Sequence, residues 1–255
     1  MSFIYSFQSE WLKKQKSAAD WLTILGAFFI PAIMLFGRLK DWDTLPKEAV
    51  SPTFWESLNN HCWQFMAMFL LPMGVIMATS LVTQLEFRNN AWKQLHTTPQ
   101  SLTTIYFSKL SVIVIMMLQF FILFNIGVYL LGVIPSLLKG VPYPIEPIPF
   151  KRLLIANGKF FIDCLPIIAL QYLVSLLFKN FLVPIGVGLA LLTASLMSLY
   201  WKYGFIFPYS YCSYNFLGSR IRPNGNNDIH FWALGYFVLF IAAGYIFYIN
   251  KKEKG

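Results

Sequence analysis

Long apolar segments alternate with short polar ones along most of the chain. Each apolar segment has about the 20 residues that an α-helix needs to cross the core of a bilayer, and none alternates apolar with polar residues as a barrel strand would. Pro31, Pro72, Pro166 and Pro184 lie within these segments, and we expect each to kink its helix. The pattern predicts six transmembrane helices, at residues 21–37, 62–85, 110–138, 160–178, 181–201 and 231–249.

The first 17 residues follow a different pattern. Phe3, Phe7 and Trp11 recur every four residues with Ile4 and Leu12 beside them, and serines, a glutamine and lysines fill much of the rest. This spacing predicts an amphipathic helix that lies in the membrane interface, with its apolar face toward the acyl chains and its lysines toward the headgroups.

Composition supports a membrane protein. The chain has 255 residues, of which 57% are hydrophobic and 12% are charged, whereas soluble domains carry about 25% charged residues. The net charge is +9, but the basic residues lie between apolar segments, so membrane lipids with anionic headgroups are the expected partner and nucleic acid is not. We therefore expect an all-α membrane protein that forms a single transmembrane domain over residues 1–255.

The distribution of charge does not orient the chain. If both termini are cytoplasmic, the lysines and arginines divide equally between the two sides of the membrane, so the positive-inside rule gives no preference. The lysines clustered near both ends favour cytoplasmic termini.

No motif for catalysis, metal binding or cofactor binding is present. The phosphate-binding pattern GxxxxGK[ST] is absent, so the chain has no recognised means of hydrolysing ATP. The three histidines and three cysteines lack the spacing of a zinc site, a redox pair or a disulfide framework. They are His61, His96, His230, Cys62, Cys164 and Cys212. An enzyme, a metal site and a resident cofactor are therefore not expected.

A channel or secondary transporter would place charges within its spans. The candidate is Asp163, near the start of the fourth span. Lys159 lies four residues earlier on the same helix face, and the two predict an interfacial salt bridge; a substrate or proton site is the alternative. The uncharged polar residues Gln119, Asn125 and Gln171 are expected to form hydrogen bonds between helices.

Residues 203–223 are rich in aromatic side chains and follow the fifth span. Tyr209, Tyr211 and Tyr214 could contact a hydrophobic substrate as it leaves the bilayer. The alternative is a short re-entrant or interfacial hairpin whose tyrosines anchor at the headgroups. The sequence favours the hairpin.

One compact polar segment, LEFRNNAWKQLHTTP at residues 85–99, separates the second and third spans. Phe87, Ala91 and Leu95 recur every four residues, which predicts a short amphipathic helix at residues 86–98. Thr98 is then the expected N-cap of the next helix, with Pro99 at its first position. Such a helix could dock in a groove of a partner protein; the alternative is a solvated or headgroup-bound loop.

This layout resembles the permease subunits of ABC-2-type transporters. The resemblance rests on the amphipathic N-terminal helix, the six spans, the ExR…WKxL…P pattern after the second span and SKL at residues 108–110. The branch that it is most similar to contains the lantibiotic-immunity and bacitracin-type permeases.

The resemblance implies that residues 86–98 are a cytoplasmic coupling helix that contacts a separate ABC ATP-binding subunit, which binds ATP and magnesium. It also implies a dimer with a second permease copy or homologue, cytoplasmic termini and a place in the bacterial cytoplasmic membrane. The expected function is export of a hydrophobic or amphiphilic substrate, such as an antimicrobial peptide, drug or lipid-like molecule. A membrane anchor, motility or signalling component is the alternative. The implied coupling residues are Glu86, Phe87, Arg88, Trp92, Lys93 and Leu95.

Overall fold

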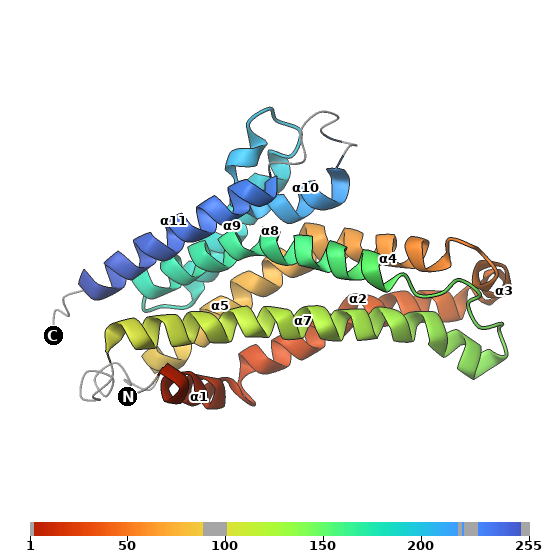
Figure 1. Ribbon diagram of the computed structural model, residues 1–255, viewed down its shortest axis with the longest axis horizontal. Helices are drawn as coiled ribbons and strands as arrows, with labels where there is room; N and C mark the ends of the chain where they lie inside the picture. The colour runs from red at the N-terminus through yellow and green to blue at the C-terminus, as the bar shows by residue number, and fades with distance from the viewer. Residues whose placement is uncertain (1–2, 89–100, 219–220, 222–228, 251–255) are drawn as a thin grey trace.

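The computed structural model describes residues 3–88, 101–218, 221 and 229–250, and this part of the chain is helical without strands. The long helices run roughly along one axis, and the two ends of the chain lie at the same end of the molecule (Figure 1). The fold class, an all-α membrane protein, is confirmed. The α-helices are α1 (Phe3–Lys14), α2 (Ala18–Lys40), α3 (Leu45–Ala49), α4 (Phe54–Phe65), α5 (Leu71–Arg88), α7 (Leu102–Lys139), α8 (Phe150–Leu177), α9 (Leu182–Met197), α10 (Tyr211–Leu217) and α11 (Ile229–Asn250).

The second apolar segment belongs to a longer helix than its hydropathy predicts. The helix begins at Phe54 rather than at residue 62, and it continues through α4, a π-helical turn η2 (Met66–Leu70) and α5. Pro72 follows the π-helical turn. Because proline has no N–H and its ring crowds the carbonyl four residues earlier, a locally wider turn lets the helix continue past it.

α7 begins at Leu102 rather than at residue 110. Ser101 is extended, with φ −71° and ψ 143°, and its Oγ accepts a hydrogen bond from the backbone N–H of Thr104. The prediction that Thr98 caps this helix is therefore wrong, and Thr98 itself lies outside the described residues. α7 has 38 residues, about 57 Å of helix, so it extends well beyond a hydrocarbon core of about 30 Å.

Five helical segments of the described chain are long and apolar enough to span a membrane: α2, α4 to α5, α7, α8 and α11. The sixth expected span, at residues 181–201, appears as the shorter apolar helix α9, which ends at Met197 after 16 residues. Sixteen residues give about 24 Å, less than the thickness of the hydrocarbon core. The number of six full spans therefore stays a prediction.

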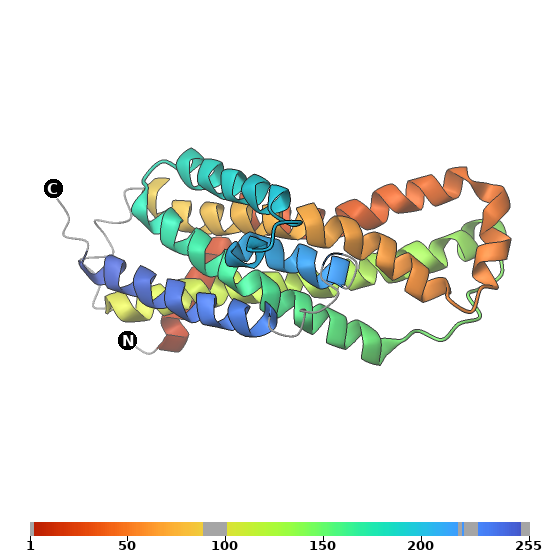
Figure 2. The ribbon, with the colours of Figure 1, turned by 90° about the horizontal axis from the view of Figure 1, so that it is seen from above.

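After α9 the chain turns back toward the bundle. Two single 3₁₀ turns, η3 (Gly204–Ile206) and η4 (Pro208–Ser210), lead into α10. α10 contacts α8, α4 and α11, and it lies between α4 and α8 when the molecule is seen from above (Figure 2). The aromatic segment thus folds as a hairpin that packs on the helices.

α8 is the central helix of the fold. It contacts α11, α5, α10, α7 and α9, and 67% of its apolar window is buried against 17% for α11. The exposed face of α2 is a continuous apolar stripe. This stripe consists of Trp21, Leu25, Phe29, Ile33 and Phe36. The buried core thus follows α8, and α2 and α11 form the periphery.

Candidate functional site

The predicted coupling segment joins α5 to α7. Glu86, Phe87 and Arg88 are the last residues of α5, and their side chains lie outside the described part of the structure. Trp92 and Lys93 lie outside the described residues altogether, and so does Leu95. The contacts of these six residues therefore stay predictions. The structure describes the helices that the segment joins, α5 and α7.

Hydrogen bonds join α5 and α7 to neighbouring parts of the bundle at this end. Gln84 of α5 donates from Nε2 to the carbonyl oxygen of Lys179, at 2.9 Å, in the turn between α8 and α9. Thr103 of α7 lies 2.8 Å from the hydroxyl of Tyr245 of α11. Residues 89–100 therefore connect helices at the end of the molecule that also holds the α8–α9 turn and both ends of the chain (Figure 1).

The predicted N-terminal helix is present, but its polar face is buried. Ser6, Glu10 and Lys14 recur every four residues and are buried where α1 packs on α7. The ammonium of Lys14 is 2.5 Å from Oδ1 of Asp20 and donates to Oε1 of Gln119 at 2.9 Å. Lys14 thus faces the protein, and the expectation that the lysines of this helix all face the headgroups is wrong for it.

Glu10, on the same face of α1, interacts with two lysines. Its carboxylate is 2.5 Å from the ammonium of Lys13 and 3.6 Å from that of Lys109 on α7. Burial alone would raise the pKa of Glu10, but the charges of Lys109 and Lys13 outweigh it and lower the pKa below its ordinary value. The opposite face of α1 is exposed and carries the apolar residues Ile4, Tyr5 and Leu12 beside the polar Gln8.

A buried polar cluster connects α5 with α8 and the hairpin. Gln171 is fully buried, and its Nε2 donates to Ser80 Oγ at 3.0 Å and to the carbonyl oxygen of Pro184 at 2.8 Å. Its Oε1 accepts a hydrogen bond from the Tyr209 hydroxyl at 3.0 Å. This cluster links the helix that precedes the coupling segment to α9 and η4.

The three polar residues expected to bond between helices do so. Besides Gln119 and Gln171, Asn125 of α7 pairs with Asn157 of α8 through two reciprocal amide hydrogen bonds of 3.1 Å. The prediction for Gln119, Asn125 and Gln171 is confirmed. Such bonds hold helices together in lipid, where polar groups have few other partners.

Asp163 has a partner other than the one predicted. Its side chain is fully buried, and Oδ1 lies 2.7 Å from Nδ1 of His230 at the start of α11. Lys159 is exposed and interacts with Asp163 only electrostatically, so the predicted salt bridge between them is wrong. The tertiary contact between α8 and α11 brings together two residues that are 67 positions apart.

The three candidate tyrosines are buried and bonded within the hairpin. The Tyr211 hydroxyl donates to the carbonyl oxygen of Phe205 at 2.8 Å, and the Tyr214 hydroxyl donates to that of Leu199 at 3.0 Å. With Tyr209 on Gln171, each hydroxyl is used by the protein itself. In this conformation the tyrosines hold the hairpin closed against the bundle, and contact with a substrate would require it to open.

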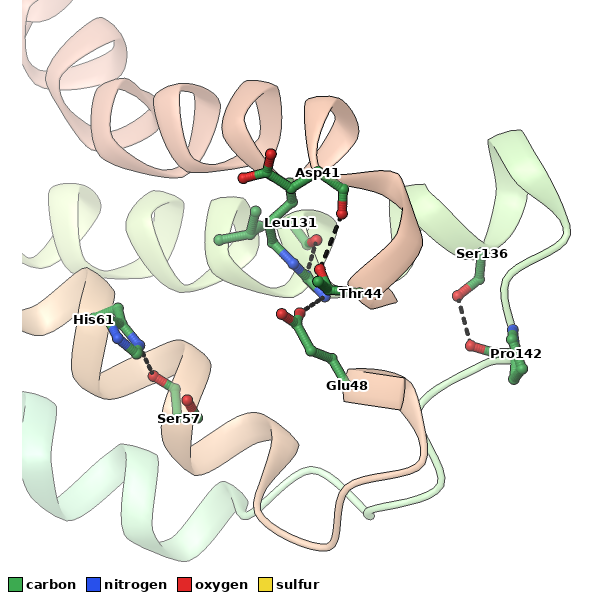
Figure 3. Close-up of polar contacts among 9 residues, drawn as sticks. Asp41, Thr44, Glu48, Ser57, His61, Leu131, Ser136 and Pro142 are labelled. Carbon is green, nitrogen blue, oxygen red and sulfur yellow. Dashed lines mark hydrogen bonds and ion pairs between the residues drawn. The ribbon is translucent and has the colours of Figure 1, made fainter. Parts of the chain in front are cut away.

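The end opposite the termini carries a second polar cluster around Arg38. Its guanidinium donates to the carbonyl oxygen of Leu131 at 2.9 Å and to Glu48 at 3.2 Å, which joins α2 to α7 and α3. Figure 3 also shows Thr44 bonded to the carbonyl oxygen of Asp41, at 2.9 Å. Sequence reasoning placed this region in a loop and missed the cluster. Arg38 at the end of an apolar run was the available signal.

Among the described residues no group of three histidine, cysteine or acidic side chains could hold a metal ion. The three cysteines are free and buried. The polar groups in the described part of the bundle serve as bonds between helices, and none of them forms a recognisable catalytic arrangement.

These features define a polytopic all-α membrane protein whose helices are joined by buried polar contacts. The family model described as ABC-2 family transporter protein matches residues 6–195. The chain belongs to this family, whose members are membrane components of transporters. Comparison with curated proteins and with solved structures gave no match.

Proposed function

We propose that the chain is the permease subunit of an ATP-driven exporter, which moves a hydrophobic or amphiphilic substrate out of the membrane or cell. The observation that carries the proposal is the match to the ABC-2 family over residues 6–195. The absence of a phosphate-binding loop in the sequence supports a separate ATP-binding subunit, which would bind ATP and magnesium.

In this proposal residues 86–98 contact the ATP-binding subunit. Their position supports it, because the polar segment connects two of the longest helical segments at the end that holds both termini. Those termini would be cytoplasmic, in the cytoplasmic membrane of a bacterium.

A movement at the end of α5 would be transmitted through hydrogen bonds to α8, α9 and the hairpin. The helix from Phe54 to Arg88 has 35 residues across α4, η2 and α5, about 50 Å. Ser80 on this helix bonds to Gln171, which in turn holds Tyr209 and the carbonyl oxygen of Pro184. A small rotation of α5 would therefore act directly on α9 and on the hairpin above it.

The proposed assembly contains two permeases and two ATP-binding subunits. Either a second copy or lipid would cover the exposed apolar stripe on α2, and the dimer itself comes from the resemblance to the family.

The test is co-expression with candidate ATP-binding proteins from the same genome, followed by co-purification and ATPase measurement. We expect a stable complex with ATPase activity, and we expect Trp92→Ala or Arg88→Glu to weaken it at least tenfold. The matched controls are Trp232→Ala in α11 and Lys47→Glu in α3, which make the same kinds of change at exposed positions outside the coupling segment. No partner, or equal loss in the controls, would contradict the proposal.

Transport distinguishes the exporter from an anchor or signalling component. The complex is reconstituted in vesicles, and loss of labelled amphiphiles from the membrane is followed with and without ATP. Release that requires ATP supports export. An intact complex that hydrolyses ATP but moves none of the amphiphiles would favour the alternative.

A further inference from the structure

A groove of about 760 Å³ opens on the molecule between α4 and α8, and residues of α10 line one side of it. Its volume is in the range of known small-molecule sites. No role proposed above involves this groove, and none of its lining residues belongs to the coupling segment. It is lined by Asn60, Trp63, Pro149, Phe150, Lys151, Arg152, Ile155, Ala156, Lys159, Phe160, Asn215 and Phe216.

The polar part of the lining consists mainly of hydrogen-bond donors. Arg152 forms an ion pair with Glu56 at 2.7 Å, so these two charges offset each other. Lys151 and Lys159 form no ion pair with the described residues, and both are exposed. Trp63 is only 6% exposed, and its Nε1 has no hydrogen-bond partner in the described part of the chain. The groove therefore offers two positive charges, and the Trp63 N–H is buried beneath its lining.

The remaining lining is apolar and aromatic. The ring of Trp63 lies 5.9 Å from that of Phe160, and Phe216 lines the same groove. At its edge Phe150 and Ile155 are exposed beside the basic residues. A ligand that fills the groove must therefore present both an apolar part and an acceptor-rich or anionic part.

The groove lies at the depth of the lipid headgroups. The three basic residues of α8 fall within its first ten positions, and Asp163 is the one charged residue between Phe160 and Leu177. Those last 18 residues make about 27 Å of helix, which matches a hydrocarbon core of about 30 Å. Lys159 therefore lies at the boundary, with Lys151 about two turns beyond it.

We propose that this groove is a binding site for an anionic phospholipid, with the headgroup phosphate between Lys151 and Lys159. Its acyl chains would continue along the apolar part of α8. The positive charge of the groove opposes a cationic amphiphile, because no lining residue is acidic. This lipid site is inferred from the lining of the groove, and it does not depend on the proposed transport function.

The experiment uses the purified full-length chain and native mass spectrometry. Phosphatidylglycerol and phosphatidylcholine of the same acyl chains compete for the protein, and bound copies of each are counted. Each lysine near a surface contributes about a fivefold preference for an anionic lipid. We therefore expect phosphatidylglycerol to be preferred about 20-fold, and the preference to fall to near unity in Lys151→Gln/Lys159→Gln.

The matched control is Lys40→Gln/Lys47→Gln, which removes the same charge from exposed positions outside the groove. It should keep the preference. Thermal unfolding midpoints unchanged by the lysine substitutions establish that those variants fold.

Three results would overturn the proposal. They are equal binding of the two lipids, equal loss of preference in both lysine pairs, and displacement of the lipid by glycerol 3-phosphate as effectively as by short-chain phosphatidylglycerol. The last result would assign the groove to a soluble phosphate compound, because the apolar part of the ligand would then contribute nothing.

Discussion

Glu10 and Lys14 show how individual charges decide where a helix lies. An amphipathic helix on a membrane normally turns its charges to water, but α1 turns these two toward α7. They meet Lys109 and the amide of Gln119 on α7, and Asp20 in the first turn of α2. A charge that leaves water is tolerated only with partners, so these contacts hold α1 in one position against the start of α7, close to the proposed coupling segment.

Glu10→Gln should therefore loosen α1. Removing the carboxylate leaves the buried ammonium of Lys109 with less compensation, at a cost on the order of 2 kcal/mol. We expect the thermal unfolding midpoint of the purified chain to fall by several degrees, while the exposed control Asp43→Asn leaves it unchanged. An unaltered midpoint in Glu10→Gln would contradict the role of this ion pair.

The same contact predicts a dependence on pH. The pKa of Glu10 is lower in the folded chain than in the unfolded one, so its stabilisation is complete above the ordinary value of 4.5 and is lost as the pH falls through the folded pKa. Acidification below about 4.5 should therefore destabilise the wild type more than Glu10→Gln. Equal losses in both proteins would exclude Glu10 as the titrating group.

At the scale of elements, close approach of helices decides the packing of the outer half of the bundle. Gly132 of α7 leaves room for the ring of Trp55 on α4, and a Cβ at this position would lie 2.6 Å from two ring carbons. The ring cannot move away easily. Its Nε1 donates to the carbonyl oxygen of Glu146 at 2.9 Å, and it stacks on Tyr129 at 6.0 Å.

Gly132→Ala should consequently destabilise the chain by about 1–3 kcal/mol, the usual cost of overpacking. Gly158→Ala is the matched control, since a Cβ there meets open space, and alanine favours a helix over glycine by up to about 1 kcal/mol. Unfolding midpoints of the two variants in the same detergent provide the measurement. Equal midpoints would show that α4 and α7 can separate without cost.

The long helices could be predicted from hydropathy, whereas the contacts between them could not. Hydropathy located the apolar helices, because lipid selects apolar residues. It missed the first turns of α4, where Glu56, Asn60 and His61 continue a helix beyond the lipid. The contacts of Asp163 with His230 and of Tyr209 with Gln171 join distant positions, so no local pattern shows them. The residues of the coupling segment came from pattern and resemblance, and they stay predictions.

The whole molecule has two different ends. One end gathers both termini, the α8–α9 turn and the helices that flank residues 89–100 (Figure 1). The other consists of α3, the polar start of α4, the far end of α7 and the basic start of α8. The positive-inside rule does not orient the chain, so a test of topology must label one residue at each of these two ends.

We expect the end that holds the termini to face the cytoplasm. A cysteine at exposed Lys47, in α3, should react with a membrane-impermeant maleimide in intact cells, whereas a cysteine at exposed Gln8 should react only after permeabilisation. The native cysteines are buried and give little background. The reverse pattern of labelling would invert the topology and place residues 86–98 outside the cell.

The short α9 gives the protein two hydrophobic thicknesses. Its 16 residues stand beside neighbours of 28 residues or more, and its outer surface, including Leu182 and Met197, is exposed. In the topology with six spans that the sequence predicts, lipids next to it would thin or tilt to match its length, at a cost of a fraction of a kcal/mol for each ångström of mismatch. Because this cost changes with bilayer thickness, the elastic state of the membrane would then act on α9 and on the hairpin that α9 contacts.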